Sequence, residues 1–234
     1  MANRTTGPQL NNSLNRGNRE WFSNLPVQPG PDYSVYFNDF LNTADYAAAD
    51  WTITTVETGT ATEAIAADEL NGGLKLTNGT ADDDSDSLQL NQENWALGAG
   101  KRMWMEVRLK ISDATQSDFF VGLNITDTTP LVTSDRVGFQ KDDGSTAILA
   151  KSEKDSTETS TDSLQVVVAD TYVKLGMYWD GMSAVAFFVN RNIVATHTTN
   201  NPDNENLAVT VHLQNGEAAA KNATIDYIYV CQER

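Results

Sequence analysis

The sequence predicts an all-β protein, an antiparallel β-sandwich or jelly roll, preceded by an extended N-terminal arm. From about residue 33 onward, apolar residues alternate with polar ones, as half-buried strands require. Turn-forming pairs such as Asn78-Gly79 and Asp180-Gly181 separate these segments, and no sustained helical stripe follows residue 33. Many short strands with regular turns favour two packed antiparallel sheets.

The expected strands follow in order along the chain, each with an apolar face that we predict to turn inward. The clearest are residues 103–111, 119–125, 185–189 and 207–213. Shorter candidates are Leu74/Leu76, Leu88/Leu90, Leu164/Val166/Val168 and Val173/Leu175/Met177. Two polar stretches, residues 82–86 and 151–163, are interpreted as solvated loop tips between strands.

Residues 1–32 are predicted to form an extended arm with a Pro-rich linker, ahead of one domain over residues 33–234. The arm is rich in Asn, Arg, Gly and Ser and has no helical or strand periodicity. Pro26, Pro29 and Pro31 favour extended backbone, which is typical of a stiff linker. We expect the arm to be disordered in isolation, because it cannot bury enough surface to offset its conformational entropy.

The formal net charge of −16 is unevenly distributed. Arg4, Arg16 and Arg19 against Glu20 give residues 1–31 a net charge of +2, so the remainder carries −18. A body of that charge repels phosphate backbones and anionic lipid. We therefore expect it to bind neither nucleic acid nor a membrane surface.

Cys231 is the only cysteine, so no intramolecular disulfide can form, which fits assembly in a reducing compartment. We expect it to be a small buried residue near the end of a strand. Residues 1–25 contain no apolar run that could serve as a signal-peptide core. No stretch approaches the roughly 18 apolar residues of a membrane span.

The C-terminal strands resemble those of a known fold. Residues 185–196 form a strand, a polar turn and a second strand, and residues 223–230 (Ala-Thr-Ile-Asp-Tyr-Ile-Tyr-Val) form a last strand after Gln214-Asn-Gly-Glu217. Together they resemble the closing strands of concanavalin-A-like (laminin-G and glucanase type) β-sandwiches. That fold serves sugar hydrolases as well as inert binding or shell proteins, so the function depends on whether catalytic groups are present.

A glucanase of this architecture is expected to place Glu-x-Asp-x-Glu on one strand, where one carboxylate is the nucleophile and another the general acid. The corresponding strand here is interpreted as residues 104–108, which supply only Glu106 and then a cation. We expect Glu106 to neighbour Arg108 and Lys110 across the pleat. The sequence thus predicts no glycosidase and no enzyme.

Other chemistries also lack their residues. His197 and His212 are interpreted as partly exposed strand residues, because neither has a local nucleophile motif. Two His and one Cys are too few for an ordinary zinc site, and no cofactor is expected. Calcium stays open as a minor alternative at residues 82–86 or 142–144, although neither has the spacing of a recognised calcium loop.

Sugar binding stays open as a second alternative, since aromatic rings can stack on a sugar. The tryptophans of the body are Trp51, Trp95, Trp104 and Trp179. Core or rim packing is the more common role of such residues in a sandwich.

Several separated motifs resemble those of tailed-bacteriophage virion proteins. They are residues 118–131 (beginning Asp-Phe-Phe-Val-Gly-Leu-Asn-Ile), 137–144, 175–181, 214–220 and 226–230. In this order they resemble capsid decoration (cement) proteins with a concanavalin-A-like body. The resemblance implies a non-enzymatic protein on the capsid exterior, assembled in the bacterial host cytoplasm, with the major capsid protein and its own copies (a dimer or trimer) as partners. The alternative is a lectin-like virion module that recognises surface glycans of the host.

The arm lies outside these motifs, so its role follows from physical argument alone. A flexible arm with arginines and scattered apolar anchors can wrap across a seam between capsomers, while the acidic body faces solvent. Arginine pairs bidentately with carboxylates, and a Trp-Phe pair can fill a pocket. The predicted interface residues are Arg4, Leu10, Leu14, Arg16, Arg19, Trp21, Phe22 and Leu25.

Overall fold

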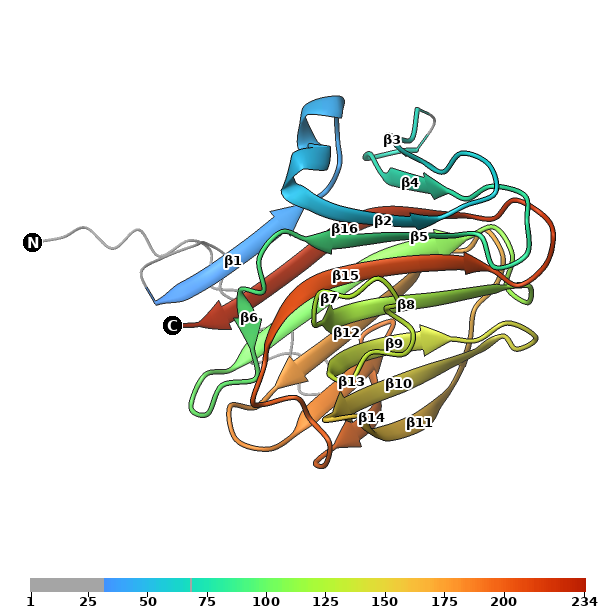
Figure 1. Cartoon of the computed structure of the whole chain (residues 1–234). Helices are drawn as coiled ribbons and strands as arrows, with labels where there is room; N and C mark the ends of the chain where they lie inside the picture. Colours follow the sequence, from blue (N-terminus) through green and yellow to red (C-terminus); the bar gives the residue numbers. More distant parts are fainter. Residues whose placement is uncertain (1–31, 68) are drawn as a thin grey trace, which may run out of the picture.

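Two antiparallel β-sheets packed face to face make up the protein in a computed structural model that describes residues 32–67 and 69–234 (Figure 1). Every strand pair in this part of the chain is antiparallel. The all-β sandwich predicted from the sequence is confirmed. The predicted arm, apart from residue 32, lies outside the described residues.

Sheet A holds the last strand of the chain at its centre. Its order is β14 (Asn192–His197), β13 (Val185–Val189), β12 (Val173–Trp179), β7 (Met103–Ile111), β16 (Asn222–Glu233), β4 (Leu74–Thr77) and β3 (Thr62–Ile65), with β1 (Tyr33–Asn38) also paired to β16.

Sheet B is built around the long strand β15. Its order is β11 (Thr157–Val166), β10 (Ala147–Lys154), β9 (Arg136–Lys141), β8 (Ser117–Asn124), β15 (Asn206–Asn215), β5 (Ser85–Leu90) and β2 (Trp51–Val56), with β6 (Trp95–Ala96) also paired to β15.

The core lies between the sheets and contains the apolar faces that the alternation predicts. Val107 of β7, Leu123 of β8 and Val209 of β15 are each 0% exposed. The two sheets meet at aromatic contacts such as that of Phe139 on β9 with Phe187 on β13, whose ring centroids are 5.5 Å apart at 89°. Alternation therefore located the inward side of the central strands correctly.

Residues 151–163 do not form the predicted loop. They belong to a hairpin of β10 and β11, which turns at Asp155 (φ 49°) and Ser156 (φ 61°). Two consecutive left-handed residues match the right-handed twist of the flanking strands. The stretch lacked an apolar signal because β11 is an edge strand whose side chains are mostly exposed.

The predicted inward face Leu164/Val166/Val168 is also wrong, since these residues are 85%, 59% and 56% exposed. Leu164 has a left-handed backbone (φ 56°), and the β10–β11 register shifts between Ala147 and Leu149. A bulge of this kind interrupts the alternation, so Val167 is buried instead.

Helix is confined to two single 3₁₀ turns in the described residues, η2 (Thr43–Asp45) and η3 (Ala48–Asp50). Asn42 caps the first of them through its side chain. Within residues 32–67 and 69–234, no helix has the length and apolar character needed to cross a membrane.

Candidate functional site

The outer face of sheet A is where the sequence placed the candidate catalytic carboxylate. Strand β7 sends alternate side chains to opposite sides, so Met105 and Val107 enter the core while Glu106 and Arg108 project outward. The antiparallel register with β16 sets Tyr229 opposite Glu106.

Glu106 is held by a bidentate ion pair. Arg191 donates from Nε to Glu106 Oε2 at 3.0 Å and from Nη2 to Oε1 at 2.8 Å, and the Tyr227 hydroxyl donates to Oε1 at 2.6 Å. Arg191 comes from the β13–β14 turn, where Asn190 (φ 50°) and Arg191 (φ 66°) are both left-handed. The tight turn thus places a cation near the centre of sheet A.

These contacts fix the charge of Glu106. Burial acts to raise the pKa of its carboxyl, but the hydrogen bonds from Arg191 and Tyr227 outweigh burial and leave the pKa below its usual value. Burial and the neighbouring carboxylate raise the pKa of the Tyr227 hydroxyl. Glu106 is therefore ionised at neutral pH and has no proton to give to a leaving group.

Glu106 shares the outer face of β7 with Arg108 and Lys110 but pairs with neither of them, because each of these cations has its own acid. Arg108 pairs with Asp226, which sits at a bulge in β16, and Lys110 pairs with Glu69. The guanidinium of Arg108 also lies 3.9 Å from the ring centroid of Tyr172.

A second catalytic carboxylate is missing from the described strands. None of them carries acids at three alternate positions, and the acids on this face, Glu106, Asp226, Glu69 and Glu233, are all ion-paired. A retaining or inverting glycosidase needs one carboxyl with a raised pKa and one free carboxylate. This face supplies neither.

An aromatic cluster occupies the other half of the same face. Trp104, Tyr178, Ala186, Phe188 and Cys231 pack together there, separately from the main core, and we call them the outer aromatic cluster. Tyr33, Val35 and Tyr229 pack against its edge. Cys231 is 0% exposed, as expected from the sequence.

No tryptophan of the described residues offers an open ring for stacking on a sugar. Trp51, Trp95, Trp104 and Trp179 are between 2% and 6% exposed. A groove of about 560 Å³ with a mixed polar and apolar lining lies beside β1 and the chain end. Its polar lining includes Asp50, Asn91, Gln92, Asn94 and Arg234.

The two histidines are buried, which corrects the expectation that they are partly exposed. His197 is 3% exposed and lies 3.0 Å from the hydroxyls of both Ser152 and Thr161. His212 is 4% exposed, and its Nδ1 lies 2.6 Å from Ser87 Oγ. Burial lowers the pKa of each histidine to about 4.

The Ser87–His212 pair resembles a nucleophile and base in distance but not in access. Ser87 is 1% exposed, so a substrate carbonyl cannot reach its oxygen. The Nε2 atom of His212 is buried without a hydrogen-bond partner, so no acid orients the ring.

The outer face of sheet B is partly closed by the loop of residues 125–135. Gln89 accepts a hydrogen bond from the Asp127 amide at 3.0 Å, and Asn124 donates to the Pro130 carbonyl at 3.1 Å. Arg136 is 3% exposed, donates to the Leu131 carbonyl and pairs with Glu153 and Glu158. These bonds hold the loop against the sheet.

The acidic stretch of residues 82–86 is a solvated tip only at Asp82 and Asp83. Asp84 is buried and accepts amide bonds from Thr58 and Ala81. Asp86 is 0% exposed, and neither of its carboxylate oxygens has a hydrogen-bond partner. Burial and nearby Glu63 and Glu57 raise its pKa to about 8.

A calcium site finds no support at either candidate stretch. Among residues 32–67 and 69–234, no group of three His, Cys, Asp or Glu side chains is arranged to hold a metal ion. At 142–144, the Asp143 amide donates to Asp118 at 2.8 Å in an exposed turn.

The predicted interface residues of the arm all lie outside the described residues. They are Arg4, Leu10, Leu14, Arg16, Arg19, Trp21, Phe22 and Leu25. The structure instead brings Glu106, Arg191 and Tyr227 into contact, a set that the sequence analysis did not predict. The sequence feature that could have indicated this contact is the Asn190-Arg191-Asn192 turn between two strands, which carries a cation.

Comparison with known proteins identifies the architecture. No protein-family model matches the sequence, and no curated protein does either. An endo-1,3-β-glucanase from Streptomyces sioyaensis superposes with a TM-score of 0.61 at 15% identity, covering 89% of this chain and 99% of that one. The body is a concanavalin-A-like β-sandwich.

Proteins of different kinds share this sandwich fold. A Bacillus licheniformis β-glucanase matches with a TM-score of 0.60 at 15% identity, covering 87% of this chain and 99% of that one. A Shewanella oneidensis protein of unknown function matches with 0.60 at 16% identity, covering 91% of each chain. The metal-free carbohydrate recognition domain of Emp46p matches with 0.53 at 10% identity, covering 78% and 88%. At these identities the likeness shows the fold alone.

Proposed function

We propose that this chain is a non-enzymatic bacteriophage virion protein, a capsid decoration (cement) protein. It binds the outer surface of the major capsid shell, as a dimer or trimer, and stabilises the shell by bridging capsomers. The observation that carries the non-enzymatic part is the ion pair of Glu106 with Arg191, which removes the only acid in the expected position. The order of the virion motifs and the cationic arm support the capsid role.

The charge distribution supports different roles for the two parts of the chain, with the arm contacting the capsid and the body facing solvent. The body carries −18 and stays solvated, whereas residues 1–31 carry +2 together with Trp21 and Phe22. An exposed acidic body favours solubility, and a cationic, aromatic segment can contact a neighbouring subunit.

A capsid-binding assay tests the proposal. Capsids lacking this protein are incubated with the full chain or with a chain deleted of residues 1–25, and occupancy is measured by sedimentation and cryo-EM. We expect the deletion to leave the body folded and to abolish or severely weaken binding. Undiminished occupancy by the truncated chain would show that the body alone docks.

The non-enzymatic part has its own test. We expect no cleavage of β-1,3 or mixed-linkage glucans by the purified chain. Cleavage that disappears in Glu106→Gln would establish a hydrolase instead.

A lectin-like host-recognition module is the second candidate, because the fold is shared with a carbohydrate recognition domain. The groove lined by Asn91, Gln92 and Asn94 offers amide groups that can bond sugar hydroxyls. Glycan-array binding that is lost in Asn94→Ala, with capsid occupancy absent, would favour this candidate.

A further inference from the structure

The outer aromatic cluster is buried although it lies on the outside of a two-layer sandwich. Its members alternate along β7, β12, β13 and β16 with core residues, so they point away from sheet B. Phe188 and Cys231 are nevertheless 0% exposed, and Trp104 is 4% exposed. One face of an antiparallel sheet normally meets solvent, so a covering group beyond the two sheets is required.

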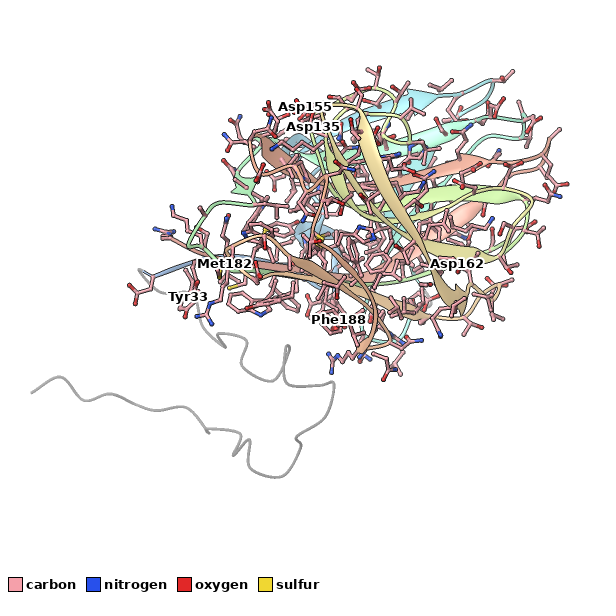
Figure 2. The ribbon with its side chains drawn as sticks, turned by 90° about the horizontal axis from the view of Figure 1, so that it is seen from below. Tyr33, Asp135, Asp155, Asp162, Met182 and Phe188 are labelled. Carbon is pink, nitrogen blue, oxygen red and sulfur yellow. The ribbon has the colours of Figure 1, made fainter. Side chains whose placement is uncertain are left out.

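Within the sheet, Phe188 packs with Tyr178 and Ala186, and the Arg191 side chain reaches across Gly176 to Glu106, but the residues directly opposite Phe188 add little cover. Phe188 faces Gly176 on β12, which has no side chain, and Ile193 on β14, which is itself 39% exposed. Figure 2 shows Phe188 and Tyr33 on one side of the molecule, with Asp135 and Asp155 on the opposite side.

We infer that the chain's own N-terminal segment, through Trp21, Phe22 and Leu25, packs on the outer aromatic cluster. The described chain begins at residue 32, and Tyr33 already packs at the edge of the cluster. The first residues that the structure describes are therefore at this face. Trp21, Phe22 and Leu25 lie within the twelve residues that precede Tyr33.

The geometry gives the segment ample reach. Phe22 precedes Tyr33 by eleven positions, a stretch that spans at most about 40 Å when extended. The face from β1 across β16, β7 and β12 to β13 covers four strand spacings, roughly 19 Å at about 4.8 Å each. Attachment in the same chain also raises the effective concentration, so the cluster is filled by its own segment in preference to a second copy.

The chemistry of the two sides matches. The cluster presents Trp104, Tyr178 and Phe188, whose rings favour edge-to-face and offset contacts with other aromatic rings. Trp21-Phe22 is the only adjacent aromatic pair in residues 1–31. The three prolines that follow it limit the conformations the linker loses on docking.

Cys231 provides a built-in probe, because it is the only cysteine and belongs to the cluster. We would measure its labelling by a maleimide under native conditions in the full chain, in Trp21→Ala/Phe22→Ala, and in the matched control Leu10→Ala/Leu14→Ala. We expect at least tenfold faster labelling in the first variant and no change in the control, with thermal unfolding of the body unaltered. Equal rates in all three folded proteins would overturn the inference.

A second measurement reports on the N-terminal segment instead of the cluster. Chymotrypsin cleavage after Trp21 and Phe22 is expected to be slow in the full chain and at least tenfold faster in Phe188→Ser, which changes only the cluster. Equal cleavage rates in the two folded proteins would overturn the inference. Thiol protection that grows with protein concentration would also overturn it, because the occupant would then be a second copy. Both assays use the free protein, so their outcome is independent of the proposed capsid role.

Discussion

Asp86 is a fully buried acid that lies near two other carboxylates, Glu63 and Glu57. Its neighbours across the strands are Thr55 on β2 and Leu213 on β15, and neither of its oxygens has a hydrogen-bond partner. Burial is the main cause of its raised pKa of about 8, against an ordinary value of 3.8. Between these values the unfolded chain releases a proton that the folded chain keeps, so stability falls as pH rises.

The histidines act in the opposite direction. The pKa of His197 and of His212 is lowered from 6.5 to about 4 by burial. Between these values the unfolded chain binds a proton that the folded chain does not, so stability falls as pH drops. Two histidines outweigh one aspartate in this lower window.

We therefore predict that the melting temperature peaks near pH 6.5, the ordinary histidine value. Between pH 6.5 and 8 the free energy of unfolding is expected to decline by up to about 1.4 kcal/mol per pH unit because of Asp86. Asp86→Asn is expected to flatten this decline. Asp82→Asn, at an exposed position of the same stretch, serves as the control. Calorimetry across this range checks it, and an unchanged slope in Asp86→Asn would refute the assignment.

The sequence could predict which residues of a strand face inward, but not how the polar ones pair. Glu106 was placed on the correct strand and outer face, yet its partner Arg191 is 85 residues away. That contact depends on the β13–β14 turn, and the contact of Arg108 with Asp226 depends on a bulge. Neither feature leaves a periodic signal.

At the scale of elements, the alternation of apolar and polar residues predicted those strands whose inner face is buried. Strands β7, β8, β13 and β15 were located for this reason, because each carries at least three inward apolar residues. Edge strand β11 was missed because it contributes little to the core, so its Thr, Ser and acidic residues were interpreted as loop.

The difference in burial between β8 and β11 predicts how well each strand tolerates an added charge. Leu123→Asp on β8 places an unpaired carboxylate at a site with 0% exposure, so we expect loss of at least about 4 kcal/mol or failure to fold. Ser160→Asp on the exposed side of β11 is expected to change stability by less than about 0.5 kcal/mol. Urea denaturation followed by circular dichroism measures both, and similar losses would contradict the edge assignment.

At the scale of the whole molecule, the proposed capsid contact and the inferred contact with the outer aromatic cluster use the same residues, Trp21 and Phe22. A segment held on its own body is unavailable to a capsid until it is released, and this lowers the apparent affinity. Phe188→Ser is therefore expected to tighten capsid binding, provided that both proposals hold. Titration of capsids that lack this protein with the full chain and with Phe188→Ser measures the difference in affinity. Weaker binding by Phe188→Ser would show that the capsid contact and the cluster contact do not compete for Trp21 and Phe22.

The arm residues themselves are expected to contribute unequally to capsid binding. Exposed ion pairs of Arg16 or Arg19 are worth about 0–1 kcal/mol each and weaken with salt. Trp21→Ala is expected to cost about 2 kcal/mol or more, since an aromatic anchor fills a pocket. Binding isotherms at two salt concentrations distinguish these effects, and a larger, salt-sensitive loss from either arginine would reverse the ranking.

The polar edge of β11 has a consequence for a protein present in many neighbouring copies. An edge strand exposes unpaired amides and carbonyls that can recruit a strand from another molecule and seed fibrous aggregates. Here the edge strand carries the exposed charge of Asp162 and a bulge in its pairing with β10, and both features hinder the addition of a strand from another copy. The sandwich can therefore be crowded on a surface or concentrated in a cell without its sheets extending from one molecule into the next.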